Sequence, residues 1–144
     1  MSHRQGGYLL AKVHQLANRV FAQKLREHNI EEINPAQGRI LFALWQGDKI
    51  SAQELAKRTS LTKTTLSSML GRLEATGHIV RVPSPDDGRE SLIMLTERDR
   101  QMQAHYDRVS AEMTTLFYRG LSELEIDRFE LTLRHILNNL AKAE

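Results

Sequence analysis

Hydrophobic residues recur along most of this chain at helical spacing. Apolar positions three or four residues apart predict a long N-terminal helix, a shorter helix that follows it, and two long helices at the C-terminal end. Asn34 predicts a cap for the second helix, and Pro35 suits its first position. Ser122 and Glu125 have the spacing of a capping box at the start of the last helix. The predicted helices cover about 8–28, 35–46, 97–120 and 122–140.

The middle of the chain, from Ile50 to Leu95, has a different pattern. Ser51 and Glu54 form another capping-box sequence, which predicts a short helix ending near Arg58. Thr62 is placed to cap a second short helix that reaches about Thr76. One face of this second helix is apolar and carries Leu66, Met69, Leu70 and Leu73, whereas the opposite face carries Thr64, Ser68, Gly71 and Ala75.

Two short apolar runs after Gly77 predict a β-hairpin. The runs 79–82 and 92–95 are separated by turn-forming residues that include Asp87-Gly88. Two helices joined by a tight turn and followed by a hairpin indicate a winged helix-turn-helix. The predicted fold is therefore mainly α with a small β-hairpin wing, and its winged-helix region covers 34–95.

The outward face of the second short helix predicts contact with DNA. Its side chains are short or hydroxylated apart from Arg72, which permits close approach to a major groove and supplies donors to bases and phosphates. An exposed Arg89 near the hairpin tip suits a narrow minor groove. The alternatives are an ordinary amphipathic helix with a hydroxyl-rich face, and a local ion pair of Arg89. The candidate DNA-binding residues are Ser51, Thr62, Lys63, Thr64, Thr65, Ser68, Arg72, Arg81, Asp87 and Arg89.

Composition and charge narrow the function. The chain has 144 residues, no cysteine and a net charge of +2, so disulfides and thiol-based redox sensing are excluded. Residues 51–82 carry five basic residues against two acidic ones, whereas residues 96–144 carry seven against nine. This asymmetry favours the middle of the chain as the surface that meets phosphate. No apolar run is long enough to span a membrane.

The chain resembles the multiple-antibiotic-resistance regulator (MarR) family of transcriptional regulators. The resemblance rests on the helix-turn-helix pattern, on Gly77-His-Ile-Val-Arg81, and on Asp87-Gly-Arg89 of the wing. Gln37, after Asn34-Pro35, also matches a family segment. The sequence departs from the family pattern in the Ser84-Pro85 region, at Gly71, and at Asp99, where a glycine is usual.

The resemblance implies a homodimer bound to a pseudo-palindromic double-stranded DNA operator. Dimerisation helices would lie in 1–33 and 96–144, on either side of the DNA-binding region, in a single subunit of 1–144. The resemblance further implies a repressor in the bacterial or archaeal cytoplasm, associated with the nucleoid and released from DNA by a small, aromatic or phenolic anion. Four residues suit such a ligand by type, although packing or surface roles are the simpler interpretation for each: His14, Arg39, Trp45 and Tyr106.

Other functions compete with this interpretation. Six histidines allow a metal-responsive regulator, with His14 and His105 as the pair of most interest, but none lie three or four residues apart. A winged-helix adaptor that binds protein is a further alternative. No nucleophile motif or glycine-rich phosphate loop is present, so we expect neither an enzyme nor a cofactor.

Overall fold

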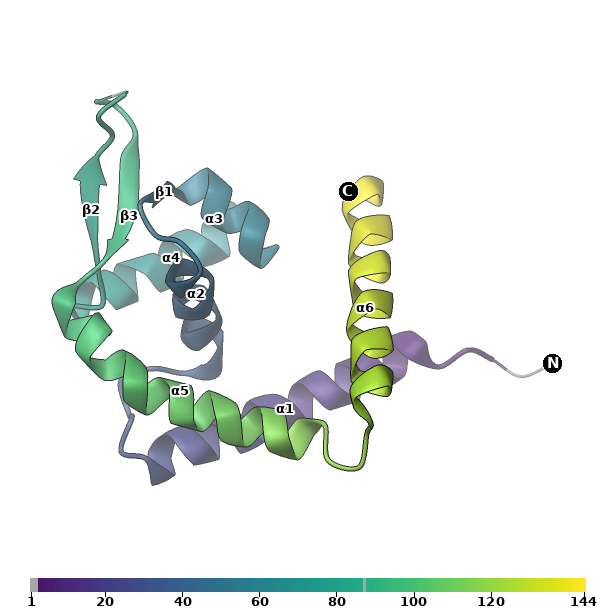
Figure 1. The fold of residues 1–144 in the computed structure, drawn as a ribbon. Helices are drawn as coiled ribbons and strands as arrows, with labels where there is room; N and C mark the ends of the chain where they lie inside the picture. Colours follow the sequence, from purple (N-terminus) through teal and green to yellow (C-terminus); the bar gives the residue numbers. More distant parts are fainter. Residues whose placement is uncertain (1–2, 87) are drawn as a thin grey trace. The chain divides into compact units, whose positions relative to one another are not determined.

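The structure, a computed structural model, describes residues 3–86 and 88–144 of the chain (Figure 1). It confirms the predicted order of helices and strands, with small differences at the ends and one additional strand. The elements are α1 Gly6–Glu27, α2 Pro35–Trp45, β1 Ile50–Ser51, α3 Ala52–Thr59, α4 Lys63–Ala75, β2 Ile79–Pro83, β3 Ser91–Leu95, α5 Glu97–Phe117 and α6 Glu123–Ala143.

The chain divides into two compact units. The first extends to Val109 and contains the winged helix, and the second comprises Ser110–Glu144. The main hydrophobic core lies in the first unit, where leucines of the apolar face of α4 pack with residues of α2, α3 and the sheet. Leu73 is completely buried there, so truncating it to alanine would cost about 2–5 kcal/mol. The buried members of these elements are Ile40, Leu41, Leu44, Leu55, Leu66, Leu70, Leu73, Ile79, Ile93 and Leu95.

The sheet has three antiparallel strands in the order β1-β3-β2. The wing strands β2 and β3 pair from Ile79 opposite Leu95 to Pro83 opposite Ser91. The additional strand, β1, pairs Ile50 with Ile93 on the other edge of β3. Because β1 ends at the residue that caps α3, the wing and the helix-turn-helix are joined through one sheet.

Side-chain caps start the helices where the sequence predicts them. Asn34 and Gln37 form a complete capping box at α2, with bonds of 2.8 and 3.0 Å. A complete box also starts α6. At α3 the predicted box is wrong in one half: the Ser51 hydroxyl accepts from the Glu54 backbone N–H. The Glu54 carboxylate instead accepts from Arg58 Nε at 3.2 Å, because the next helical turn offers it a cation.

Large apolar side chains remain exposed at the N-terminal half of α1 and along α6. In the first unit, Leu9 and Leu16 are 51% and 52% exposed. In the second unit, Leu137 and Leu140 of α6 are 57% and 64% exposed, and no residue of α6 is buried. These apolar faces are incompletely covered. None of the helices described is long and apolar enough to cross a membrane.

Candidate nucleic-acid interface and effector cavity

Helix α4 presents the predicted polar face to solvent. Lys63, Thr64, Ser68 and Arg72 are all exposed on it. Among the described residues, neither Lys63 nor Arg72 forms an ion pair, so both charges are available to phosphate.

Two of the predicted contact residues have structural roles as helix caps. The Thr62 hydroxyl accepts from the Thr65 backbone N–H at 3.3 Å and donates to the Thr65 hydroxyl at 3.0 Å. Ser51 caps α3 in the same way. A capped helix N-terminus carries partial positive charge, so the starts of α3 and α4 favour a nearby phosphate.

A groove lies between α3, α4 and β2. Its volume is about 300 Å³, and Lys63 and Arg81 line it together with Gln53 and Ser67. The sequence interpretation did not include Gln53 and Ser67, because the groove is formed by residues of two helices and a strand together. Arg81 is held by Glu74, with Nε 3.7 Å from the carboxylate.

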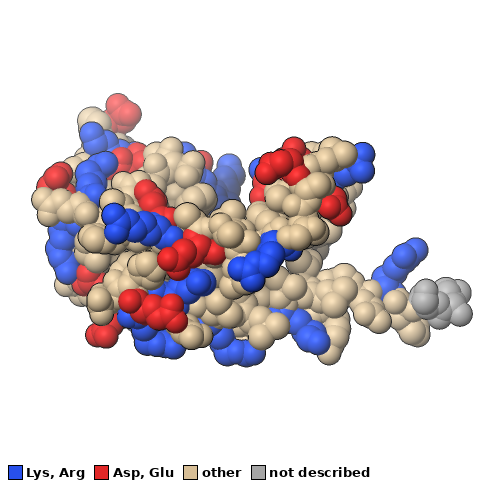
Figure 2. All heavy atoms as spheres, turned by 60° about the horizontal axis from the view of Figure 1, so that its bottom comes forward, with Lys and Arg blue, Asp and Glu red and all other residues tan. Residues whose placement is uncertain are grey.

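The wing contains Arg89, the last of the predicted DNA-contacting residues that lie within the described part of the chain. Arg89 is exposed in the loop between β2 and β3. The loop closes through the Ser84 backbone N–H, which donates to the Glu90 carbonyl at 2.8 Å. Asp87, the other predicted wing residue, lies outside the described residues. On the face drawn in Figure 2, basic side chains are interspersed with acidic ones, so that face carries charges of both signs.

A larger cavity of about 640 Å³ lies among α1, α2 and the end of α3. Its polar lining is a connected chain: Arg39 Nη2 donates to Asn18 Oδ1 at 2.6 Å, and Asn18 Nδ2 lies 3.2 Å from His14 Nε2. Arg58 adds a second guanidinium, and Phe42, 57% exposed, adds an aromatic ring. An aromatic wall beside two guanidinium groups suits a small aromatic anion.

The structure brings His14 and Arg39 to this cavity but not Trp45 or Tyr106. Tyr106 is buried and packs edge-on against Phe21 and Trp45, with ring centroids 5.8 and 4.9 Å away. Burial raises the pKa of its phenol, which stays neutral. Trp45 donates from Nε1 to Asp99 at 2.8 Å. Neither aromatic residue lines this cavity, because both pack α1, α2 and α5 together, the simpler role that the sequence favoured for each.

Metal ligation by the histidines finds no support in the part of the chain that the structure describes. In the described parts of the chain, no group of three or more His, Asp or Glu side chains is placed to hold a metal ion. His14 and His105 are both exposed.

Known transcriptional regulators are similar to this chain in sequence and fold. The sequence model of the MarR family matches residues 32–90. The HTH-type transcriptional repressor IacR of Pseudomonas putida is 24% identical over 92% of this chain and 78% of its own length. A mutant MarR from E. coli, solved in complex with operator DNA, is 26% identical, with a TM-score of 0.79 over 91% of this chain and 92% of that chain. BpsR of Bordetella bronchiseptica, whose structure concerns regulation of DNA binding by 6-hydroxynicotinic acid, is 22% identical, with a TM-score of 0.78 over 100% of this chain and 99% of that chain. This chain is therefore similar to MarR-family DNA-binding transcriptional regulators, through residues 32–90 and through its fold.

Proposed function

We propose that this regulator is a homodimeric repressor, which holds a pseudo-palindromic operator through α4 and the wing. The observation that carries the proposal is the outward face of α4, where exposed hydroxyls alternate with the uncompensated charges of Lys63 and Arg72. Short donors fit a major groove, and the charges fit the phosphates that flank it. Repression is supported by the relationship to IacR.

The exposed apolar faces support the homodimer. Leu9 and Leu16 in the first unit, and Leu137 and Leu140 in the second, are each more than half exposed. Each therefore still lacks roughly half of the 1.5–3 kcal/mol that full burial of a leucine side chain provides. A second copy of the chain offers the same apolar faces in return, as a twofold interface requires. Two recognition helices would then read half-sites about 10 base pairs apart.

The cavity beside Arg39 supports release by a small aromatic anion. A ligand shifts the protein away from DNA only if it binds the non-binding conformation more tightly. The cavity is placed for this because α1 and α2 line it together with the end of α3, the helix that precedes the recognition helix. BpsR, whose DNA binding is regulated by an aromatic acid, shares the fold.

Displacement from a fluorescent operator duplex tests this function. The operator is first selected from a random library, and 6-hydroxynicotinate and benzoate are then added as probes. We expect Arg39→Ala to keep its DNA affinity while losing at least tenfold in sensitivity to the anion. Arg19→Ala, which removes a guanidinium that does not line the cavity, is the matched control. Equal sensitivity of the two variants would refute the cavity as the effector site.

A further inference from the structure

A buried histidine lies at the junction between the α1–α2 loop, the end of α4 and the start of α5. The His78 side chain is completely buried, and Asp99 beside it is 1% exposed. His78 Nδ1 lies 2.9 Å from Asp99 Oδ1, and His78 Nε2 lies 3.5 Å from Glu32 Oε1. The imidazole ring is therefore placed between two carboxylates that come from different segments of the chain.

The contacts of Asp99 indicate an ionised carboxylate. One oxygen accepts from Trp45 Nε1 at 2.8 Å, and the other faces His78 Nδ1. An ionised carboxylate can only accept hydrogen bonds, so it suits a donor on each of its two oxygens. A buried negative charge also needs a cation close to it. Trp45 is neutral, so His78 is the group in contact with Asp99 that can supply the charge.

The second ring nitrogen of His78 points to the same conclusion. With Asp99 ionised, Nδ1 carries the hydrogen that faces its carboxylate, and buried Nε2 has no hydrogen-bond partner in the described structure. If the ring were neutral, the Nε2 lone pair would face the Glu32 carboxylate without a proton between them. A proton on Nε2 turns this contact into attraction between imidazolium and carboxylate.

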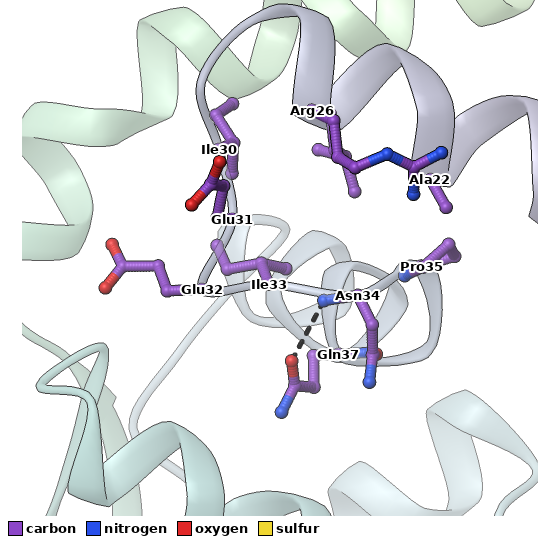
Figure 3. A pocket seen from close by; sticks show the side chains of 10 residues that line it. Ala22, Arg26, Ile30, Glu31, Glu32, Ile33, Asn34, Pro35 and Gln37 are labelled. Atoms are coloured by element: carbon purple, nitrogen blue, oxygen red, sulfur yellow. Dashed lines mark hydrogen bonds between the residues drawn. The ribbon is translucent and has the colours of Figure 1, made fainter.

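Glu32 links the histidine to the recognition helix by a second route. Its other oxygen, Oε2, accepts from Arg98 Nη2 at 2.7 Å. Arg98 also donates from Nη1 to the carbonyl of Thr76, the C-cap residue of α4. Figure 3 shows Glu32 on the loop between α1 and α2, beside Glu31 and Ile33. This loop is thereby tied to the C-terminal end of α4.

We propose that Glu32, His78 and Asp99 form a proton-dependent clamp, in which doubly protonated His78 positions the C-terminal end of the recognition helix for DNA. Loss of the Nε2 proton leaves the Asp99 contact intact but removes the attraction between His78 and Glu32. Arg98 then holds Glu32 alone, so α4 is held less firmly against the α1–α2 loop. The charged groups that face the ring or its partners are Glu32 on the loop, and Asp99 and Arg98 on α5. Arg98 opposes the imidazolium, whereas the two carboxylates favour it.

The sign of the pH dependence follows from these contacts. The clamp stabilises the fold while His78 is charged, so its contribution is present at low pH and lost as pH rises. The proposal rests on the proposed function for its effect on DNA, but the clamp itself is measurable without DNA.

The test compares the full chain with Glu32→Gln. A glutamine amide accepts from a charged His78 and, after rotation, donates to a neutral one, so this variant keeps a contact but loses its pH response. Glu31→Gln, a neighbouring carboxylate that is exposed, is the matched control. Nitrogen-15 NMR of the His78 ring reports directly which nitrogens carry protons between pH 5.5 and 9.

We expect both His78 nitrogens to be protonated at pH 6, with the Nε2 proton lost at a lower pH in Glu32→Gln than in the wild type or Glu31→Gln. Duplex affinity should fall about tenfold from pH 6 to pH 8.5 in the wild type and the control, which corresponds to about 1.4 kcal/mol lost from the contact between imidazolium and carboxylate. In Glu32→Gln this fall should be at most threefold. An unprotonated Nε2 at pH 6, or identical pH profiles for the two variants, would overturn the clamp. Failure of the wild type to bind DNA at any pH would instead contradict the proposed function, with the NMR result still deciding the clamp.

Discussion

The hydroxyl of Tyr106 in α5 occupies the space that a side chain at Gly38 in α2 would need. A Cβ built on Gly38 would lie 1.5 Å from Tyr106 Oη and 2.7 Å from Cζ. Glycine at this position therefore lets α5 approach α2 closely. The hydroxyl is buried there and has no hydrogen-bond partner in the described structure.

Tyr106→Phe should leave the protein equally stable or more stable. The substitution keeps both edge-on ring contacts and removes an unsatisfied buried hydroxyl, which costs about 1–3 kcal/mol. Thermal and urea unfolding measure the effect. A loss of more than 1 kcal/mol would show that the hydroxyl has a partner that this packing does not include.

Gly38→Ala should destabilise the fold by about 1–3 kcal/mol, because the added methyl group overpacks the contact with Tyr106. Gly71→Ala is the control, since a Cβ at that helical position meets nothing within 4 Å. That control should be stabilising by about 0.5–1 kcal/mol, from helix propensity alone. Equal unfolding free energies for the two alanine variants would contradict the close approach.

The phenol of Tyr118 in the second unit should ionise at a higher pH than an ordinary tyrosine. A hydrogen bond donated to Glu130 Oε2 at 2.6 Å raises its pKa to about 12. Because the folded pKa is raised, the bond's contribution to stability is complete below the ordinary value of about 10 and is lost as pH rises through about 12. Ultraviolet difference titration against Tyr118→Phe isolates this phenol. Glu130→Gln should move its midpoint towards 10, and a wild-type midpoint already at 10 would rule out the bond.

Replacing Leu137 and Leu140 by glutamate should convert the proposed dimer into a monomer. Two charges placed in an apolar interface cost more than the transfer free energy they replace, so the dimer should weaken at least a hundredfold. Sedimentation equilibrium measures the change. Asn138→Glu is the control, because Asn138 lies about 100° from Leu137 and about 160° from Leu140 around the helix. An unchanged mass for the double variant would show that the dimer interface does not include Leu137 and Leu140.

Local signals account for the parts of the fold that the sequence predicts well. The Asn34–Gln37 and Ser122–Glu125 caps join residues three apart, so their pattern is visible in the chain itself. The end of α4 is predicted equally well, because Gly77 adopts the left-handed conformation, φ 83°, expected after a helix. Strand β1 was not predicted, because a strand of two residues is too short to show an alternation of apolar and polar positions.

Contacts between distant segments account for what the sequence does not reveal. His78 and Asp99 are 21 residues apart, and Trp45 and Asp99 are 54 apart. No local pattern indicates that Asp99, at a position where the family usually has glycine, would be buried beside a histidine. Arg39 and His14 were named from the sequence because they suit an anion by type, and whether they bind one stays a prediction. The connecting Asn18 carries no signal of its own.

The central claim, that the outward face of α4 meets DNA, is tested most directly by fluorescence-anisotropy titration of a 30-base-pair duplex at two salt concentrations. Wild-type protein of verified mass is compared with Lys63→Ala/Arg72→Ala and with the control Arg134→Ala/Lys142→Ala, which removes two cations of α6. We expect wild type and control to bind with a steep loss of affinity as salt rises. The Lys63/Arg72 variant should bind at least tenfold more weakly, with a shallower salt dependence and an unchanged mass. Unchanged affinity and salt slope in that variant would contradict the account.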